Sequence, residues 1–277
     1  MTVRKLMESD RTQAEAQWRD IFEESPAFAA YYFENRFHPA YSFGAFEGDR
    51  LIAMALGRPT QIAVGGKSHK ALLVAGVSTI PAYRRQGLMH RLMTHLVDNA
   101  RDSGFSCCYL HPVTETLYAS LGFRNGTDAL IIRSDGARKH KAFDLRDGVV
   151  CGDMQSVYGA LLAVHDGMQI RDEREFRTVF ADYATENAKT VIAYAENRPV
   201  GYICYSDEGT VFELLAHCAP AYAALLDEAA KRAGKELKAI VPTNCGVDGE
   251  RHYSMQYLVF KDAFGLPLKN GFCRLAY

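Results

Sequence analysis

Hydrophobic and polar positions follow two different periods along this chain, and the change between them is clearest over residues 71–102. Residues 71–77 are an uninterrupted apolar run with the length and residue types of a buried strand. Pro81 ends this strand, because proline has no N–H to donate to a sheet. From Leu88 onward the apolar residues recur at the helical period, which predicts a helix over 88–102. The face expected to be buried consists of Leu88, Leu92, Met93, Leu96, Val97 and Ala100.

The remainder of the first half alternates between helical and strand-like patterns. Two helical segments come first, and Ser25 is placed to cap the second because Pro26 follows it at the first helical position. Short strands come next, separated by the turn sequences Gly48-Asp49 and Gly65-Gly66. The expected elements are helices over 12–22 and 26–36, and strands over 41–47, 51–57, 61–64, 105–110 and 129–132.

The second half repeats this order of elements in a weaker form, after a polar and basic segment at residues 134–147. The expected elements there are strands over 190–195, 200–205 and 211–215, and a helix over 220–233. We therefore predict a first domain over 1–138, a linker over 139–149 and a second domain over 150–277. The fold class expected is α+β (α/β), with a mixed central sheet flanked by helices.

A basic loop, Arg84-Arg85-Gln86-Gly87, lies between the strand and the helix described first. The first turn of a helix has free N–H groups and the positive end of the helix dipole, and Gly87 lets a ligand approach the backbone closely. A phosphate or pyrophosphate is the expected ligand. The alternative is an ordinary strand–turn–helix with a solvated arginine pair. The loop has neither Walker spacing nor the three-glycine dinucleotide fingerprint.

The loop and the helix that follows, Arg84-Arg85-Gln86-Gly87-Leu88-Met89, resemble the Arg/Gln-x-x-Gly-x-Gly/Ala acetyl-coenzyme A loop of GCN5-related N-acetyltransferases (GNAT). A second segment, residues 117–123, resembles the Leu-Tyr-x-x-Leu-Gly-Phe signature of the same family and follows at the expected distance. Met89 departs from the pattern, because the family usually has Gly or Ala there. Two tandem domains of this kind, the second degenerate, resemble the enhanced-intracellular-survival (Eis)-like branch without its sterol-carrier-like domain.

The resemblance implies roles for particular residues. Val77, Ser78 and Thr79 match the splayed strand whose backbone contacts the thioester and the pantetheine. The pyrophosphate would lie on the N–H groups of Arg84, Arg85, Gln86, Gly87, Leu88 and Met89. Tyr118 matches the tyrosine that protonates or hydrogen-bonds the coenzyme A sulfur, and the alternative for Tyr118 is a core aromatic.

The residue that would remove the proton from the amine is less well defined. Many family members use a glutamate on the strand before the loop, but residues 71–77 contain no carboxylate. In the Eis-like branch the C-terminal carboxylate matches this role, which would be supplied here by Tyr277. The alternatives are Glu115, His111 and Glu24.

The acceptor would bind against the first helices of the chain. The aromatic residues Phe28, Tyr31 and Tyr32, together with Glu24 and Glu34, would suit a cation with an apolar part. The alternative for these aromatic residues is core packing. In the second domain, His217-Cys218-Ala219-Pro220 lies where the cofactor loop would be and has neither its glycine nor its charge.

Composition excludes several other classes of function. The net charge of −1 gives no global field toward nucleic acid or anionic membranes, and no apolar run approaches the roughly 20 residues of a membrane span. The N-terminus has no apolar core of a signal peptide, and seven scattered cysteines are typical of a reducing compartment, so a cytoplasmic protein is expected. We find no metal-ligand spacing and no Gly-x-Ser-x-Gly hydrolase motif.

The sequence is therefore identified as a GNAT-type N-acetyltransferase that uses acetyl-CoA, without a metal, to acetylate an amine of a small molecule or peptide by direct transfer. Two alternatives stay open: an acyl-CoA-binding sensor without turnover, and a scaffold whose degenerate half mediates assembly. The sequence does not identify the acceptor. It also leaves open whether the protein forms a homo-oligomer.

Overall fold

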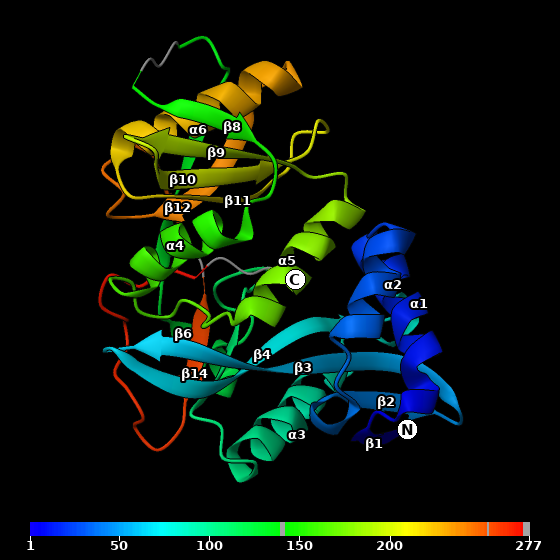
Figure 1. The fold of residues 1–277 in the computed structure, drawn as a ribbon. Helices are drawn as coiled ribbons and strands as arrows, with labels where there is room; N and C mark the ends of the chain where they lie inside the picture. Colours follow the sequence, from blue (N-terminus) through cyan, green and yellow to red (C-terminus); the bar gives the residue numbers. More distant parts are fainter. Residues whose placement is uncertain (139–141, 254, 274–277) are drawn as a thin grey trace.

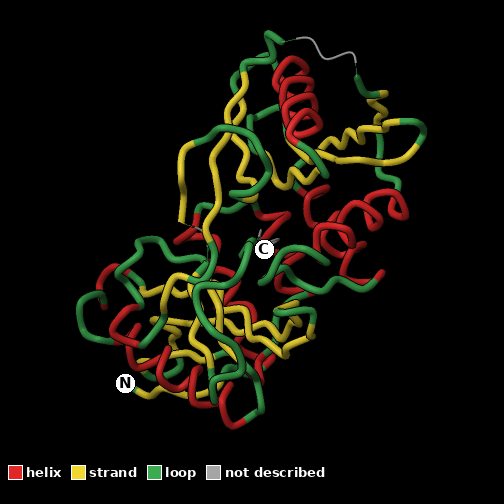
Figure 2. The backbone as a smooth tube through the Cα atoms, turned by 90° about the vertical axis from the view of Figure 1, so that its left-hand side faces the viewer, coloured by secondary structure: helices red, strands yellow, loops and turns green. Residues whose placement is uncertain are grey.

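The structure is a computed structural model that describes residues 1–138, 142–253 and 255–273. Figure 1 shows two parts stacked on each other, one built mainly from the first half of the chain and one from the second. Figure 2, turned by 90°, shows that strands lie between helices in both parts. This arrangement confirms the predicted α+β class with a mixed sheet flanked by helices.

Within the described residues, the first part contains a seven-stranded sheet in the order β1-β2-β3-β4-β5-β14-β6. All neighbouring strands are antiparallel except β4 and β5, which run parallel. Helix α3 covers one face, and α1 and α2 cover the other. The bounds are β1 Thr2–Lys5, α1 Arg11–Phe22, α2 Pro26–Asn35, β2 Phe43–Glu47, β3 Arg50–Val64, β4 Lys67–Thr79, α3 Leu88–Asp102, β5 Cys107–Leu110 and β6 Arg124–Asn125.

The second part repeats the order of two antiparallel hairpins, a helix and a strand. Its four-stranded sheet has the order β11-β10-β9-β8, with α6 on one face and α4 and α5 on the other, within the described residues. The bounds are β8 Asp144–Asp147, α4 Cys151–Leu162, α5 Glu173–Thr185, β9 Lys189–Ala195, β10 Arg198–Tyr205, β11 Val211–Ala216, α6 Ala219–Ala233 and β12 Leu237–Pro242.

The two halves exchange strands. Strand β14, Gln256–Val259, comes from the end of the chain but lies between β5 and β6 of the first sheet. In the other direction β7, Asp128–Ser134, pairs with β12 and with β13, Glu250–Tyr253, of the second half. Pairing therefore crosses residues 139–149 in both directions, and the division of the chain at this segment stays a prediction.

The individual elements agree with the sequence pattern where that pattern is local. The buried residues of α3 are the six predicted, and Ser25 Oγ caps α2 by accepting a hydrogen bond from Phe28 N at 3.1 Å. The prediction of separate strands over 51–57 and 61–64 is wrong, because β3 runs through both without a break. Strand β1 was not predicted, and it pairs along the edge of β2.

A buried ion pair joins the two halves. Arg36, which follows α2, and Asp182 on α5 are 2.9 Å apart at Nη2 and Oδ2, and their side chains are 2% and 1% exposed. Figure 1 shows α2 and α5 side by side. Burial raises the pKa of Asp182 to about 7, although Arg36 and Arg58 act to lower it. The charges are thus held in a low-dielectric contact between the halves.

Two negative findings apply to the described part of the chain. No helix there is both long enough and apolar enough to cross a membrane. No group of three or more His, Cys, Asp or Glu side chains is placed there to hold a metal ion.

Candidate active site

The first sheet opens between its two parallel strands. Strands β4 and β5 pair from Ala71 with Cys107 to Leu73 with Tyr109. Beyond Leu73, β4 continues to Thr79 and stays paired with β3 on its other side. The edge of β4 that faces β5 is therefore left without a strand partner among the described residues. Unpaired backbone groups at such an edge can bind an extended ligand as a further strand would.

A bulge shapes this open section of β4. Met54 of β3 pairs with Ser78 and Leu56 with Ala75, so Ala55 faces two residues, Gly76 and Val77. Gly76 has a φ of 56°, which favours glycine. A Cβ atom at Gly76 would lie 2.4 Å from Cζ3 of Trp18, so the indole packs directly against the bulged backbone.

The basic loop leads from β4 into α3. Arg84 Nε donates a hydrogen bond to the carbonyl oxygen of Thr79 at 3.1 Å, which holds the start of the loop against the end of the strand. Arg85 and Gly87 both have positive φ, at 61° and 73°, and Gly87 is the N-cap of α3. The first turn of α3 has no side-chain cap and no acidic residue. Its free N–H groups and the exposed arginines make this end of the helix suited to an anion.

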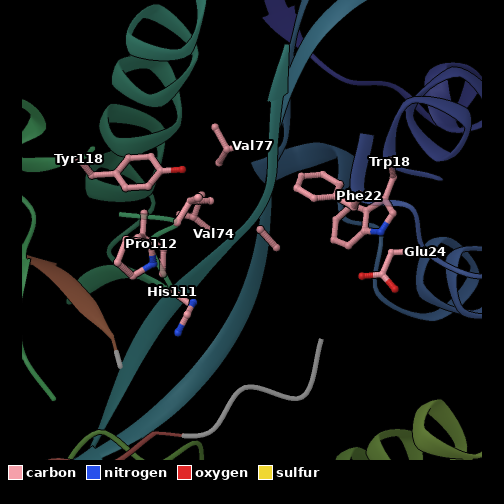
Figure 3. A pocket seen from close by; sticks show the side chains of 12 residues that line it. Trp18, Phe22, Glu24, Val74, Val77, His111, Pro112 and Tyr118 are labelled. Atoms are coloured by element: carbon pink, nitrogen blue, oxygen red, sulfur yellow. The ribbon is translucent and has the colours of Figure 1, made fainter. Parts of the chain in front are cut away.

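A cavity of about 340 Å³ lies at the opening between β4 and β5. Figure 3 shows Tyr118 and His111 on one side of it and Trp18, Phe22 and Glu24 on the other. The cavity extends from the opening between β4 and β5 to the end of α1. A substrate group bound at β4 would therefore lie close to both walls of the cavity. The lining residues are Trp18, Phe22, Glu24, Val74, Ala75, Gly76, Val77, Leu110, His111, Pro112, Val113 and Tyr118.

The residues predicted to contact the cofactor lie along one path. Val77 lines the cavity, and Ser78 and Thr79 follow it at the end of β4. Ser78 is buried, and its hydroxyl accepts a hydrogen bond from Gln17 Nε2 at 2.9 Å. The path continues through Arg84, Arg85, Gln86, Gly87, Leu88 and Met89, at the loop and the first turn of α3.

The side chain of Tyr118 is packed in the core and also lines the cavity. Its side chain is 5% exposed and packs in the core beside Phe123, with ring centroids 5.9 Å apart. It also lines the cavity, and Figure 3 shows its hydroxyl directed toward β4. The core alternative and a role at the reaction site are thus compatible for this residue.

The candidate bases differ in whether they line the cavity. Glu24 and His111 line the cavity. Glu115 does not line it, and its carboxylate accepts a hydrogen bond from Asn125 Nδ2 at 3.4 Å. Tyr277 lies outside the described residues. Burial, followed by the nearby charge of Glu186, raises the pKa of Glu24 above its usual value.

Of the residues predicted for the acceptor wall, Glu24 lines this cavity and the aromatic residues do not. Phe28 and Tyr32 are 8% and 2% exposed and pack in the core between the helices and the sheet. Neither they, nor Tyr31, nor Glu34 line the cavity, where Trp18 and Phe22 take their place. The sequence signals for Trp18 and Phe22 at this cavity were Gly76, whose place inside a strand indicates a bulge, and the aromatic residues near the end of α1.

The corresponding place in the second half is built differently. Strand β11 leads into α6 through His217 and Cys218, and Cys218 is the N-cap, with extended backbone at a φ of −153°. Neither a glycine nor an arginine lies between the strand and the helix. The structure thus gives the second half the elements of the first without the basic loop.

Comparisons with known proteins agree with this geometry. The family model described as "Acetyltransferase (GNAT) domain" matches residues 2–126. An uncharacterized N-acetyltransferase from Streptomyces griseus is 29% identical over 150 residues, which cover 48% of this chain and 36% of that protein. The match therefore spans about a third of that relative's length.

Two solved structures share the fold over nearly the whole chain. Eis1 from Mycobacterium abscessus has a TM-score of 0.68 at 17% identity, covering 94% of this chain and 74% of that one. A GCN5-related N-acetyltransferase from Kribbella flavida has a TM-score of 0.69 at 19% identity, with coverages of 93% and 70%. Residues 2–126 match the GNAT acetyltransferase domain model, which confirms the resemblance read from that part of the sequence, and the two solved structures show the same fold.

Proposed function

We propose that this protein is an N-acetyltransferase that moves the acetyl group of acetyl-CoA directly to an amine of a small molecule or peptide. The observation that carries the proposal is the continuous path from the open edge of β4, through the basic loop, to the free N–H groups of α3. The match of residues 2–126 to the GNAT domain model supports it independently.

The residues along this path fit the chemistry of coenzyme A. The exposed loop and the uncapped first turn of α3 suit a pyrophosphate, because they combine free N–H donors, two arginines and a positive dipole end. A Cβ atom at Gly87 would meet nothing within 4 Å, so the backbone is open to a ligand there. The open edge of β4 suits the amide-containing pantetheine arm. When bound, acetyl-CoA supplies an activated acetyl group as a thioester.

Tyr118 is proposed to hold or protonate the departing sulfur. A free tyrosine has a pKa near 10 and a thiol one near 8.5, so full proton transfer costs about 2 kcal/mol without help from the site. A hydrogen bond from the hydroxyl to the sulfur needs no such transfer. The position of Tyr118 on the cavity, with its hydroxyl toward β4, supports this role.

Glu24 is proposed to take the proton of the amine. An alkylamine with a pKa near 10.4 is mostly protonated at neutral pH, and freeing it costs about 4–5 kcal/mol. A carboxylate whose pKa is raised is a stronger base than an ordinary one, and Glu24 has this property on the cavity wall. His111 is the other cavity-lining candidate, on the opposite wall.

The proposal is tested by incubating the protein with acetyl-CoA and a panel of primary amines, and measuring the release of the coenzyme A thiol. Turnover with any amine that also yields the acetylated product supports an enzyme. Tight binding of acetyl-CoA without turnover on any amine would support a sensor instead and would contradict the proposal.

The variant Tyr118→Phe is expected to lower kcat by about 10²-fold while the Kd for acetyl-CoA stays nearly the same, because the ring remains and only the hydroxyl is lost. Stopped-flow or thiol-release kinetics measure this. The matched control is Tyr158→Phe, which removes a buried hydroxyl that donates to the Gln169 carbonyl oxygen at 2.7 Å, away from the cavity. Equal losses of kcat in both variants would assign Tyr118 a packing role only.

A further inference from the structure

We propose that the second half of the chain completes the acceptor side of the site through Glu186, a positioning residue for Glu24. This inference rests on the proposed acetyltransferase function and deepens it. It gives the degenerate half, which lacks the basic loop, a part in the reaction. The observations that carry it are the contacts of the short connection between α1 and α2.

This connection, residues 23–25, is held from the other half of the molecule. Glu24 lines the cavity, and the next residue, Ser25, donates a hydrogen bond from its hydroxyl to the carboxylate of Glu186. The same hydroxyl accepts a hydrogen bond from Phe28 N, which caps α2. Glu186 follows α5 directly as its C-cap. A single residue of the second half thus fixes the segment that carries Glu24 at the start of α2.

Glu186 also acts on Glu24 through its charge. Neither carboxylate forms an ion pair with a lysine or arginine among the described residues, so no direct ion pair offsets their mutual repulsion. After burial, the charge of Glu186 is what raises the pKa of Glu24. Like charges near each other disfavour ionisation, which makes the remaining carboxylate more basic.

The other titratable groups around Glu24 do not take this role. His111 and Tyr118 lie on the opposite wall of the cavity, and the exposed Glu23 precedes the partly buried Glu24. On α5, Asp182 is paired with Arg36, so its charge is largely compensated. Glu186 is therefore the residue of the second half whose negative charge acts on Glu24.

The consequence is a defined pH dependence. Glu24 must be ionised to accept a proton, so activity falls as the pH drops through its pKa. Because that pKa is raised, the acid limb of kcat/KM lies above the pH of an ordinary carboxyl group. Removing the charge of Glu186 lowers the pKa of Glu24, and activity then persists to lower pH.

The direct test is the titration of Glu24 followed by NMR on protein labelled with ¹³C-glutamate, with the Glu24 signal assigned from a Glu24→Gln variant. Glu186→Gln keeps a hydrogen-bond acceptor for Ser25 but removes the charge, and it is expected to shift the midpoint of Glu24 to lower pH. Glu186→Asp keeps the charge and is expected to stay near the parent. The control Glu173→Gln, at the opposite end of α5 in a solvent-exposed pair, is expected to change nothing.

Kinetics provide the second readout. With an amine that the panel shows to be turned over, the acid limb of kcat/KM in Glu186→Gln should move down by the same amount as the Glu24 midpoint. If Glu186→Gln does not fold, the Glu24 midpoint of the parent is measured at 0.05 and 1 M salt, and screening is expected to lower it.

The outcomes separate the two proposals. An unchanged Glu24 midpoint in folded Glu186→Gln, or in the parent at high salt, overturns the role of Glu186 and leaves the acetyltransferase function intact. Failure of the parent to bind acetyl-CoA or to turn over any amine overturns the proposed function, whatever the Glu24 midpoint does.

Discussion

A polypeptide that ends at residue 138 is expected to be insoluble when it is made alone. In the whole chain, β14 covers the edge of β5 from Cys107 to Leu110, and its residue Tyr257 is fully buried and stacked on Tyr109 at 5.6 Å. Without residues 139–277 that edge and its apolar surface face solvent, and β7 loses both of its partners. Unpaired apolar edges of this kind promote aggregation.

Supplying the missing half is expected to reverse this effect. Coexpression of residues 1–138 with residues 142–277 should give a soluble complex, measured by size-exclusion chromatography and by recovery of one cooperative unfolding transition. The control is the full chain with a protease site inserted after residue 138, which should stay assembled after cleavage. A folded, monomeric 1–138 fragment with its own sharp thermal transition would contradict the importance of the strand exchange.

Asp182→Ala is expected to lower the free energy of unfolding by about 3–5 kcal/mol, because it removes the carboxylate that pairs with the buried charge of Arg36. Arg36 is 2% exposed, so solvent cannot replace the lost carboxylate. Urea unfolding at pH 8, above the Asp182 pKa of about 7, measures the change with both groups of the parent charged.

Two further variants separate the ion pair from general packing. The double variant with Arg36→Met and Asp182→Leu is expected to be less destabilised than Asp182→Ala, because neither member of the pair is left as a buried charge. Asp207→Asn breaks an exposed pair with Lys189, at 55% and 52% exposure, and is expected to cost less than about 1 kcal/mol. A similar small cost for Asp182→Ala would mean that water or another group compensates Arg36.

The sequence predicted the site best where the signal is local. The strand, the basic loop and the buried face of α3 follow from adjacent residues, since the period changes sharply between Pro81 and Leu88. Tyr118, which was predicted from a motif at a fixed distance from the loop, lines the cavity.

The rest depends on contacts between distant residues, which no local pattern encodes. Strand β14 reads only as a short apolar segment, and nothing in residues 256–259 indicates that they pair with β5. The aromatic residues that line the cavity were missed for the same reason. Phe28 and Trp18 are both aromatic residues on amphipathic helices, and only the packing of Trp18 against the bulge at Gly76 brings it to the cavity.

The most direct test of the whole account is the binding of acetyl-CoA, measured as the shift in thermal unfolding. The parent should be stabilised by nearly 3 kcal/mol at about 100 times the Kd. Gly87→Glu should lose this shift, because a carboxylate would stand where the pyrophosphate is proposed to lie. Gly66→Glu is the matched control: its φ of 71° is close to the 73° of Gly87, and a Cβ at either position meets nothing within 4 Å. A parent that shows no shift, or a Gly87→Glu variant that binds as the parent does, would contradict the cofactor site on which the proposed function depends.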